Sequence, residues 1–329
     1  MNMTKKPVLL GIGNALVDIM IRLESDDSLK HFELPKGSMT LVDADFAQKV
    51  YNETEGLPKE ITSGGSVANS MRGLASLGMK CGYIGKTNQD EFGAIFKKEM
   101  EDAGVSPIIL NGENPTGKAT ALISPDSERT FATYLGAAIE LSADDLNKEM
   151  FDGYNYFHIE GYLVQNHELI ERSAQLAKEA GLKVSIDLAS YNVVEDNKEF
   201  LRGLVKNYVD IVFANEEEAK AISDLEPEEA LHWLSEFTEI AVVKIGKEGS
   251  LIKKDGEVTK VGGSGKVSVD TTGAGDLYAA GFYYGLLNGL SMDKCGAVAT
   301  ILAGRVIEVI GAVIPEKEWD CIKSEIAAL

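Results

Sequence analysis

The sequence predicts an α/β fold in which a mainly parallel sheet is covered by helices on both faces. Short apolar segments alternate with longer amphipathic segments along most of the chain, and several amphipathic segments end at a glycine. Residues 19–42 and 110–136 depart from this alternation and read as β-like segments with turns. We expect these two stretches to form a small sheet that projects from the main body. Since no proline- or serine-rich linker interrupts the chain, residues 1–329 are expected to form one domain.

The first elements follow from apolar runs that glycines interrupt. Residues 7–23 predict a buried strand, a break at glycine and a second extended segment. Residues 66–78 carry small and apolar side chains at helical spacing, and Gly78 is a typical helix stop. Residues 80–86 predict another strand, and residues 91–104 predict an amphipathic helix.

The same unit of helix and strand recurs in the C-terminal half. Helical patterns at 167–181, 201–208 and 226–237 precede apolar segments at 182–189, 210–215 and 240–246. Strands that are joined through helices pair in parallel, and a buried parallel strand reads as a continuous apolar run. This order therefore predicts the parallel sheet and the helices on its two faces.

The composition excludes several classes of partner. The 329 residues include 32 Lys+Arg and 52 Asp+Glu, so the formal net charge is 32 − 52 = −20. This charge would repel nucleic acids and anionic membranes, whereas a small anionic ligand can still bind in a local pocket. The chain also lacks the apolar run of about 18 residues that a membrane-spanning helix needs. Cys81, Cys295 and Cys321 lie far apart without a CxxC pair, so we expect a cytoplasmic protein.

The strongest motif lies at 267–289, VSVDTTGAGDLYAAGFYYGLLNG. We expect an extended segment that ends at Asp270, a turn at Gly273–Gly275, and a helix that starts near Asp276. The glycines let successive N–H groups point at one spot, where they and the helix dipole form an anion site suited to a phosphate.

Asp276 has two explanations at this position. A carboxylate near the N-terminus of a helix stabilises that helix by about 0.3–1 kcal/mol. The same carboxylate would, however, repel a phosphate bound beside it. Its place is better explained if it accepts a proton from a hydroxyl that attacks phosphorus.

A second motif is SGGSVANSMRGLASLG at 63–78. Gly64 and Gly65 permit a ligand to approach the backbone closely, and Asn69 offers both a donor and an acceptor. The alternative is a plain strand-to-helix turn that Ser66 caps.

A third motif is GIGNALVDI at 11–19. Asn14 and Asp18 follow the first strand, where a carboxylate can accept two hydrogen bonds from a vicinal diol. The alternative is a turn asparagine followed by a cap-like aspartate.

Taken together, the three segments resemble the PfkB carbohydrate kinases, also called the ribokinase-like family, and the resemblance covers essentially the full chain. GGSVANSMRGLASLG is similar to the N-terminal signature of that family, and DTTGAGDLYAAGF to its C-terminal signature. NEEEA at 215–219 resembles the family's Asn-x-x-Glu motif, although alone it would be an acidic helix start. GNALVDI, KGSMTLVD, TYLGA and EGYL are most similar to the bacterial adenosine-kinase-like branch.

The resemblance implies both a fold and a reaction. The fold is the ribokinase-like three-layer α/β/α arrangement, with a mainly parallel central sheet and a small β-sheet lid at about 19–42 and 110–136. The reaction is ATP-dependent transfer of the γ-phosphate to a primary hydroxyl of a ribonucleoside or sugar, with adenosine as the first choice. A ribose- or fructose-type sugar or a sugar acid is the alternative acceptor. An alternative of another class is a non-catalytic nucleotide- or sugar-binding regulator.

The resemblance also implies roles for individual residues. Asp276 would be the catalytic base, and Gly273, Ala274 and Gly275 would form the anion hole with the Asp276 N–H. The acceptor would be bound by Asn14, Asp18, Gly64, Gly65 and Asn69, with Tyr134 and Glu160 as further candidates. The nucleotide would be bound by Asn215, Glu218, Lys244, Gly246, Gly273, Gly275, Ala303 and Ile307. Mg²⁺ would accompany ATP and be held through water by Glu218, and K⁺ would bind near Asp270 and 306–312.

The sequence departs from the family pattern at Lys244, where relatives more often have threonine or serine. Relatives occur as monomers and as dimers joined through the lid sheets, and both states remain open for this chain.

Competing motifs are incomplete. GIGNAL lacks the last glycine of a dinucleotide fingerprint, GGSGKV at 262–267 lacks the final Ser or Thr of a Walker A loop, and HELIE at 167–171 lacks the second histidine of a zinc protease.

Overall fold

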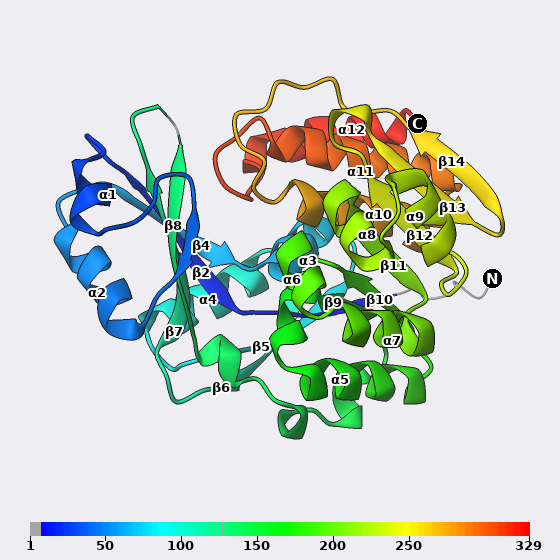
Figure 1. Cartoon of the computed structure of the whole chain (residues 1–329), viewed down its shortest axis with the longest axis horizontal. Helices are drawn as coiled ribbons and strands as arrows, with labels where there is room; N and C mark the ends of the chain where they lie inside the picture. Colours follow the sequence, from blue (N-terminus) through cyan, green and yellow to red (C-terminus); the bar gives the residue numbers. More distant parts are fainter. Residues whose placement is uncertain (1–7, 127) are drawn as a thin grey trace.

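The computed structural model describes residues 8–126 and 128–329 and places them in two sheets surrounded by helices (Figure 1). The larger sheet has the strand order β14-β13-β12-β11-β10-β9-β1-β5-β6. Its strands are β1 (Leu9–Ile12), β5 (Cys81–Thr87), β6 (Val105–Asn111), β9 (Tyr156–Glu160), β10 (Lys183–Asp187), β11 (Ile211–Asn215), β12 (Ile240–Lys244), β13 (Ser250–Lys254) and β14 (Glu257–Val261). All pairs from β6 to β12 are parallel, and only β13 and β14 are antiparallel. The mainly parallel central sheet is therefore confirmed.

Helices cover both faces of this sheet, because alternate strand residues enter two separate apolar clusters. Leu9 lies in one cluster and Leu10 in the other. The first cluster also contains residues of α3 (Ser66–Ser76), α4 (Glu91–Asp102), α10 (Ala274–Leu287), α11 (Met292–Val306) and α12 (Trp319–Ala327). The second contains residues of α5 (His167–Glu179), α6 (Tyr191–Asp196), α7 (Lys198–Tyr208), α8 (Glu216–Ser223) and α9 (Pro227–Leu234). The three-layer α/β/α arrangement follows from these two clusters (Figure 1).

The smaller sheet has the strand order β3-β8-β7-β2-β4. Its strands are β2 (Leu16–Arg22), β3 (Met39–Leu41), β4 (Lys59–Gly64), β7 (Thr116–Ile123) and β8 (Arg129–Gly136). The predicted segments 19–42 and 110–136 contain most of this sheet but omit β4, and residues 110–111 end β6 of the larger sheet. Strand β4 (KEITSG) was missed because Ile61 is its only large apolar residue.

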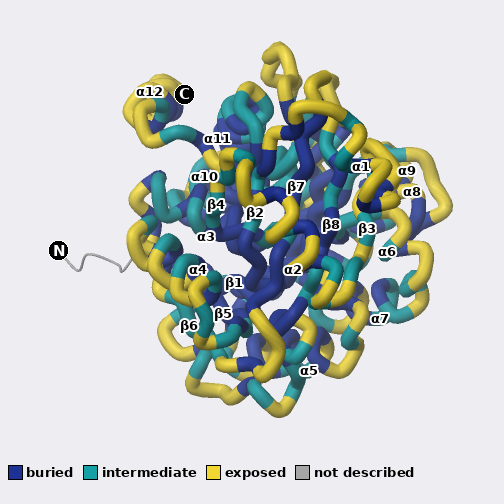
Figure 2. The backbone as a smooth tube through the Cα atoms, turned by 90° about the vertical axis from the view of Figure 1, so that its left-hand side faces the viewer, coloured by how far each residue is buried: buried dark blue, intermediate teal, exposed yellow. Residues whose placement is uncertain are grey.

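The two faces of the smaller sheet have different surroundings. One face packs its apolar residues against α1 (Asp27–His31) and α2 (Ala44–Glu53), which contribute Leu29 and Val50 to the core. Strands β2 and β7 are consequently buried over most of their length (Figure 2). The opposite face, which we call the inner face, carries Asp18, Met20, Met39, Leu41, Thr62, Ala119, Ala121, Arg129, Phe131 and Thr133, as the pairing registers require.

The inner face lies against the main body. Arg129 forms an ion pair with Asp270, and a Cβ on Gly311 would lie 2.4 Å from Cε of Met20. The smaller sheet is therefore positioned over the loops at Asp270 and Gly311, as expected of a lid.

The segment before α10 forms no strand. We expected an extended stretch that ends at Asp270, but residues 262–272 run as a loop that meets the end of α11, where the amides of Val269 and Asp270 bond to the carbonyl of Ile307. The alternating valines that suggested extended pairing point outward, and Val267 is 83% exposed.

None of the helices in the described ranges is long and apolar enough to cross a membrane. Cys81 and Cys295 are buried and Cys321 is exposed, and all three are free thiols.

Candidate active site

Polar residues gather where the parallel strands end, at one edge of the larger sheet. The residues at or just beyond these carboxyl ends are Asn14, Glu160, Asp187, Asn215 and Lys244. The helices α3 and α10 begin close to this edge and pack against each other. In open parallel sheets this edge is where ligands bind, because loops and helix N-termini converge there.

The start of α10 is where we expect the anion hole. Gly273 precedes the helix with φ = +76°, and a Cβ there would lie 2.6 Å from that of Ala312, so only glycine fits. Ala274 donates its amide to the carbonyl of Thr271, whereas among the described residues no group accepts from the amides of Gly273, Gly275 and Asp276. A Cβ on Gly275 would lie 3.2 Å from Nζ of Lys244, which places the ammonium group beside the same turn. Amides and ammonium together favour an anion here.

The carboxylate of Asp276 is held by two side chains of α3. Ser66 Oγ donates to Oδ1 at 2.6 Å, and Asn69 Nδ2 donates to Oδ2 at 2.9 Å. Ser70 Oγ donates to the backbone carbonyl of Asp276 at 2.9 Å. Ser66 is therefore a partner of Asp276 and not the helix cap of the alternative explanation, since Gly65 is the residue that precedes α3.

The environment of Asp276 adjusts its basicity. Burial raises the pKa of Asp276 to about 6, although the hydrogen bonds from Ser66 and Asn69 oppose the shift. At neutral pH the group is ionised, yet it is a stronger base than an ordinary aspartate. These are the properties required of a group that accepts a proton from a hydroxyl.

Asp18 lies on the inner face of the smaller sheet, next to β4. A Cβ on Gly64 would lie 2.2 Å from Oδ1 of Asp18, so this glycine makes room for the carboxylate. Burial raises the pKa of Asp18 to about 7, while the positive charge of Arg72 opposes the shift. Among the described residues, none donates a hydrogen bond to the Asp18 carboxylate, so both oxygens can accept from a ligand.

Glu160 has a different place from the one we expected. Its Oε1 accepts from Nδ2 of Asn14 at 2.7 Å, and its Oε2 accepts from the amide of Val67 at 3.2 Å. Burial raises the pKa of Glu160 to about 7, against these hydrogen bonds. Because both oxygens are occupied, Glu160 orients Asn14 and the start of α3. Gly65, with φ = +101°, passes close to the Asn14 carbonyl.

The structure does not bring Tyr134 to this cluster. Tyr134 pairs with Lys118 across β7 and β8, and the Lys118 ammonium lies over the rings of Tyr51 and Phe92. Tyr134 is thus on the helix-covered face, because the side-chain period of a strand is two. The tyrosine near the site is Tyr162, whose pKa is raised to about 12 by burial and by Glu160 and other carboxylates.

Lys244 and two carboxylates form the nucleotide side of the site. Lys244 Nζ bonds to Oδ2 of Asp187 at 2.9 Å. Burial alone would lower the pKa of Lys244, but Asp187 and Glu218 together raise it above its usual value. In place of the expected hydroxyl, the chain therefore supplies a fixed positive charge beside Gly275.

Asn215 and Glu218 form a capping box at the start of α8. The amide and Nδ2 of Asn215 donate to Oε2 and Oε1 of Glu218, each at 2.7 Å. Burial raises the pKa of Glu218 to about 7. No cluster of three or more metal-ligating side chains occurs in the described ranges. Mg²⁺ commonly binds through one or two carboxylates, several waters and the phosphates of its substrate, so Glu218 and Asp187 fit a magnesium ion that arrives with ATP.

Asp270 does not fit the monovalent-cation role. Its carboxylate accepts from the amides of Thr272 at 2.8 Å and Gly311 at 2.6 Å, and it is ion-paired with Arg129. Two amides and a guanidinium therefore already contact this carboxylate.

The remaining nucleotide candidates border the same region. Gly246 follows β12 with φ = +53° and lies near the Glu216 carboxylate. Ala303 and Ile307 pack, partly buried, against the core at the end of α11. The loop 262–272 passes over them, and its exposed Val267 and Val269 add apolar surface there.

Comparison with known proteins agrees with this site. The model of the pfkB family carbohydrate kinases matches residues 38–319. The chain belongs to this family. It is a kinase of the sugar and nucleoside class, a phosphotransferase whose acceptor is a hydroxyl group.

Two solved structures of this pfkB kinase fold are similar over nearly the whole chain. A probable sugar kinase from Rhizobium etli is 32% identical, with a TM-score of 0.86 over 98% of this chain and 100% of that one. An adenosine kinase from Sinorhizobium meliloti is 34% identical, with a TM-score of 0.85 over 98% of this chain and 99% of that one. A 5-dehydro-2-deoxygluconokinase from Clostridium perfringens is 30% identical over 292 residues, which are 82% of this chain and 85% of that protein.

Several residues at the site of this pfkB kinase were missed in the sequence. Asp187 ends the apolar run VSID, and its place at a strand end is a signal that could have found it. Arg72, Arg129 and Tyr162 carry no such signal, because only the packing of α3, the smaller sheet and the turn at 161–165 brings them here.

Proposed function

We propose that the protein is an ATP-dependent kinase that phosphorylates the primary hydroxyl of a ribonucleoside, with adenosine as the preferred acceptor. The observation that carries this proposal is the pairing of a carboxylate with an apolar surface on the inner face of the smaller sheet. Asp18 occupies one row of this face, and Met20, Ala121, Phe131 and Met39 occupy the next. Residues two apart in a strand are separated by about 7 Å, which suits a ribose diol on one row and a flat base on the other.

The apolar part of the inner face is open rather than filled. The exposed part is the β3 edge, where Met39 is 57% exposed and Leu41 is 54% exposed, whereas Ala121 on β7 is buried. Exposed apolar surface beside a polar anchor is typical of a binding site for an aromatic ring. A small sugar or a sugar acid would leave this surface unused, which supports the nucleoside over the alternative acceptors.

The reaction follows from the groups at the start of α10. The acceptor hydroxyl attacks the γ-phosphorus, its proton passes to the carboxylate of Asp276, and the bond from that phosphorus to the ADP oxygen breaks. Ser66 and Asn69 hold the carboxylate in place through one hydrogen bond to each oxygen. The amides of Gly273, Gly275 and Asp276 and the Lys244 ammonium stabilise charge on the transferred phosphoryl oxygens.

Mg²⁺, held through water by Glu218 and Asp187, would neutralise charge on the ATP phosphates when bound. The smaller sheet excludes water, which would otherwise compete with the acceptor at its bulk concentration of about 55 M.

Because the outer face of that sheet is covered by α1 and α2, we propose a monomer rather than a dimer joined through the lids. The free cysteines support the cytoplasm as its compartment.

An acceptor panel tests the proposal. ADP release is measured with ATP·Mg²⁺ and, in turn, adenosine, inosine, ribose, fructose and sugar acids, with the Asp276→Asn protein as control for contaminating kinases. We expect adenosine to give the highest kcat/KM, by at least about tenfold over the free sugars, since a methylene-sized loss of apolar contact alone costs that much. Higher kcat/KM with a sugar or sugar acid would refute the nucleoside assignment. Zero turnover with every acceptor would favour the non-catalytic regulator, which the intact Asp276 and its glycine turn argue against.

A further inference from the structure

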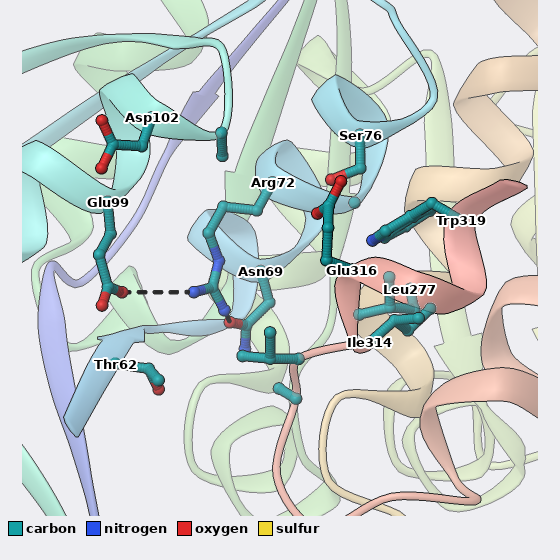
Figure 3. Close-up of a pocket in the computed structure, with 14 residues that line it drawn as sticks. Thr62, Asn69, Arg72, Ser76, Glu99, Asp102, Leu277, Ile314, Glu316 and Trp319 are labelled. Atoms are coloured by element: carbon teal, nitrogen blue, oxygen red, sulfur yellow. Dashed lines mark hydrogen bonds and ion pairs between the residues drawn. The ribbon is translucent and has the colours of Figure 1, made fainter. Parts of the chain in front are cut away.

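Arg72 is a charged residue of α3 that the proposed reaction does not use. Its side chain is only 11% exposed and, with Asn69 and Glu99, lines a cavity of about 320 Å³ (Figure 3). Nη2 donates to Oδ1 of Asn69 at 2.8 Å, and Nη1 donates to Oγ of Ser63 at 2.9 Å. Nη1 also lies 3.8 Å from Oε2 of Glu99. A buried guanidinium must be held by such contacts to offset its lost hydration.

The contact with Asn69 determines how that amide is oriented. A guanidinium can only donate hydrogen bonds, so the atom of Asn69 that faces Arg72 must be the oxygen. The amide nitrogen is then the atom that faces Oδ2 of Asp276, at 2.9 Å. A flipped amide would oppose one N–H group to Arg72 and an oxygen to the Asp276 carboxylate, and both contacts would be repulsive.

Arg72 also balances the charges on the acceptor side. Asp18, Asp276 and Glu99 all interact with it electrostatically. The titratable and charged groups around Asp276 are Asp18, Arg72, Glu160, Tyr162, Asp187 and Lys244. Carboxylates outnumber cations in this set, and Lys244 is already paired with Asp187. Arg72 is thus the cation left to face Asp18 and Asp276 together.

We propose that Arg72 is a positioning residue of this kinase, which holds the Asn69 amide in the orientation that donates to Asp276 and supplies the positive charge that faces Asp18 and Asp276. The proposal rests on the proposed function only in taking Asp276 as base and Asp18 as acceptor ligand. It assigns a role to a residue of the 63–78 segment for which the sequence analysis gave none. A purely structural role, in which Arg72 merely joins β4 to α3 and α4, is the alternative to be tested.

The test compares Arg72→Met, Arg72→Lys and the control Arg202→Met. Methionine keeps an apolar stem, and the neighbouring cavity means that it meets no packed wall. Arg202, on α7, is likewise partly buried and bonded to a carbonyl and to Asp224, but it lies away from the site. Measurements are kcat and KM for each substrate, the pH dependence of kcat/KM for the acceptor, and Tm.

Removal of the Arg72 charge disfavours the ionised carboxylates, so the pKa values of Asp18 and Asp276 must rise. The base works only when ionised, so activity is lost as pH falls, and this acid limb moves upward. In Arg72→Met we expect kcat/KM for the acceptor at pH 7 to fall by about tenfold or more, the acid limb to shift upward by about one pH unit, and KM for ATP to change less than about threefold. Arg72→Lys, which keeps the charge, should restore the pH limb but only part of kcat. Arg202→Met should change none of these.

A second readout does not require turnover. In protein labelled with ¹³C at aspartate Cγ, the titrations of Asp18 and Asp276 are followed by NMR in the wild type and in the Arg72→Met and Arg72→Lys variants. Upward shifts of both titrations in Arg72→Met, reversed in Arg72→Lys, support the proposal even if the acceptor assignment fails. Unshifted titrations and an unshifted pH profile, with only a lower Tm, would overturn it. If Arg72→Met does not fold, the test rests on Arg72→Lys. This variant keeps the positive charge, so the acid limb of its pH profile should lie within about half a pH unit of the wild type. A larger difference would overturn the proposal.

Discussion

Replacement of Asp276 by asparagine is expected to lower kcat by about 10³-fold, because a positioned general base contributes about 10²–10⁴ to such a reaction. Ser66 can still donate to the amide oxygen, but the N–H of Asn69 would then face the new amide nitrogen, so one of the two contacts on this group is lost. KM for ATP should stay within about threefold of the wild type, since the amides at 273–275 and Lys244 are untouched. The checks are steady-state kinetics at saturating acceptor and a thermal unfolding curve.

Asp293→Asn is the matched control for this variant. Asp293 is an exposed acid in the first turn of α11. Its replacement by asparagine removes the same charge from a helix N-terminus without touching the site. Burial raises the pKa of Asp276 above its value of 3.8 in the unfolded chain, so its ionisation opposes folding as pH rises from about 4 to about 6. The relief of this buried charge is offset by the lost contact with Asn69, so Tm of Asp276→Asn should stay close to that of the wild type at pH 7. Near-normal kcat in this variant would show that another group accepts the proton.

Replacement of Asp18 by alanine is expected to lower kcat/KM for the acceptor by about 10²–10³-fold, because hydrogen bonds to a charged group contribute about 1.5–3 kcal/mol each. Affinity for ATP should not change, since Asp18 lies on the smaller sheet and the nucleotide residues lie at the ends of β11 and β12. Kinetics with each substrate varied in turn separate the two effects. Loss of this buried carboxylate, whose pKa is raised to about 7, should not lower Tm at neutral pH.

Deoxygenated acceptors provide the control for Asp18. The wild type should lose about as much kcat/KM with a 2′- or 3′-deoxynucleoside as the variant loses with the parent ribonucleoside. Asp18→Ala should in turn discriminate little between the parent and the deoxygenated acceptors, because the partner of the diol is gone. Full discrimination in the variant would assign the diol to a residue other than Asp18.

The larger sheet was predictable because its signal is local. Runs such as IAVVKIG and DIVFAN are apolar throughout, and each follows a helical pattern that ends at the expected residues. Glycine stops at 78 and 104 adopt positive φ, as the ends of α3 and α4 require. Strand β4 was not predictable in this way, because it contains no apolar run. Gly64, at its end, is needed to make room for Asp18 on a neighbouring strand, and that requirement is not visible in the local sequence.

The candidate site was predictable where one short motif contains both the reactive side chain and the glycines that shape the turn beside it. Asp276 and the glycines at 273 and 275 are three residues of one turn, so their proximity needs no tertiary information. Ser66 entered the sequence analysis only as the helix cap of the alternative explanation, because its partner is 210 residues away in the chain. Glu160 and Tyr134 were placed by motif likeness alone. The structure shows that one supports Asn14 and that the other lies on the helix-covered side of its strand.

The measurement that tests the central claim most directly is the proton-coupled ³¹P NMR spectrum of the product formed from ATP·Mg²⁺ and adenosine. A phosphate on a primary hydroxyl couples to the two protons of its CH₂ group, so we predict a phosphomonoester triplet that appears with the wild type and not with Asp276→Asn. A doublet would place the phosphate on a secondary hydroxyl. ADP with inorganic phosphate alone would mean that no acceptor hydroxyl attacks at this site, and either result would contradict the account.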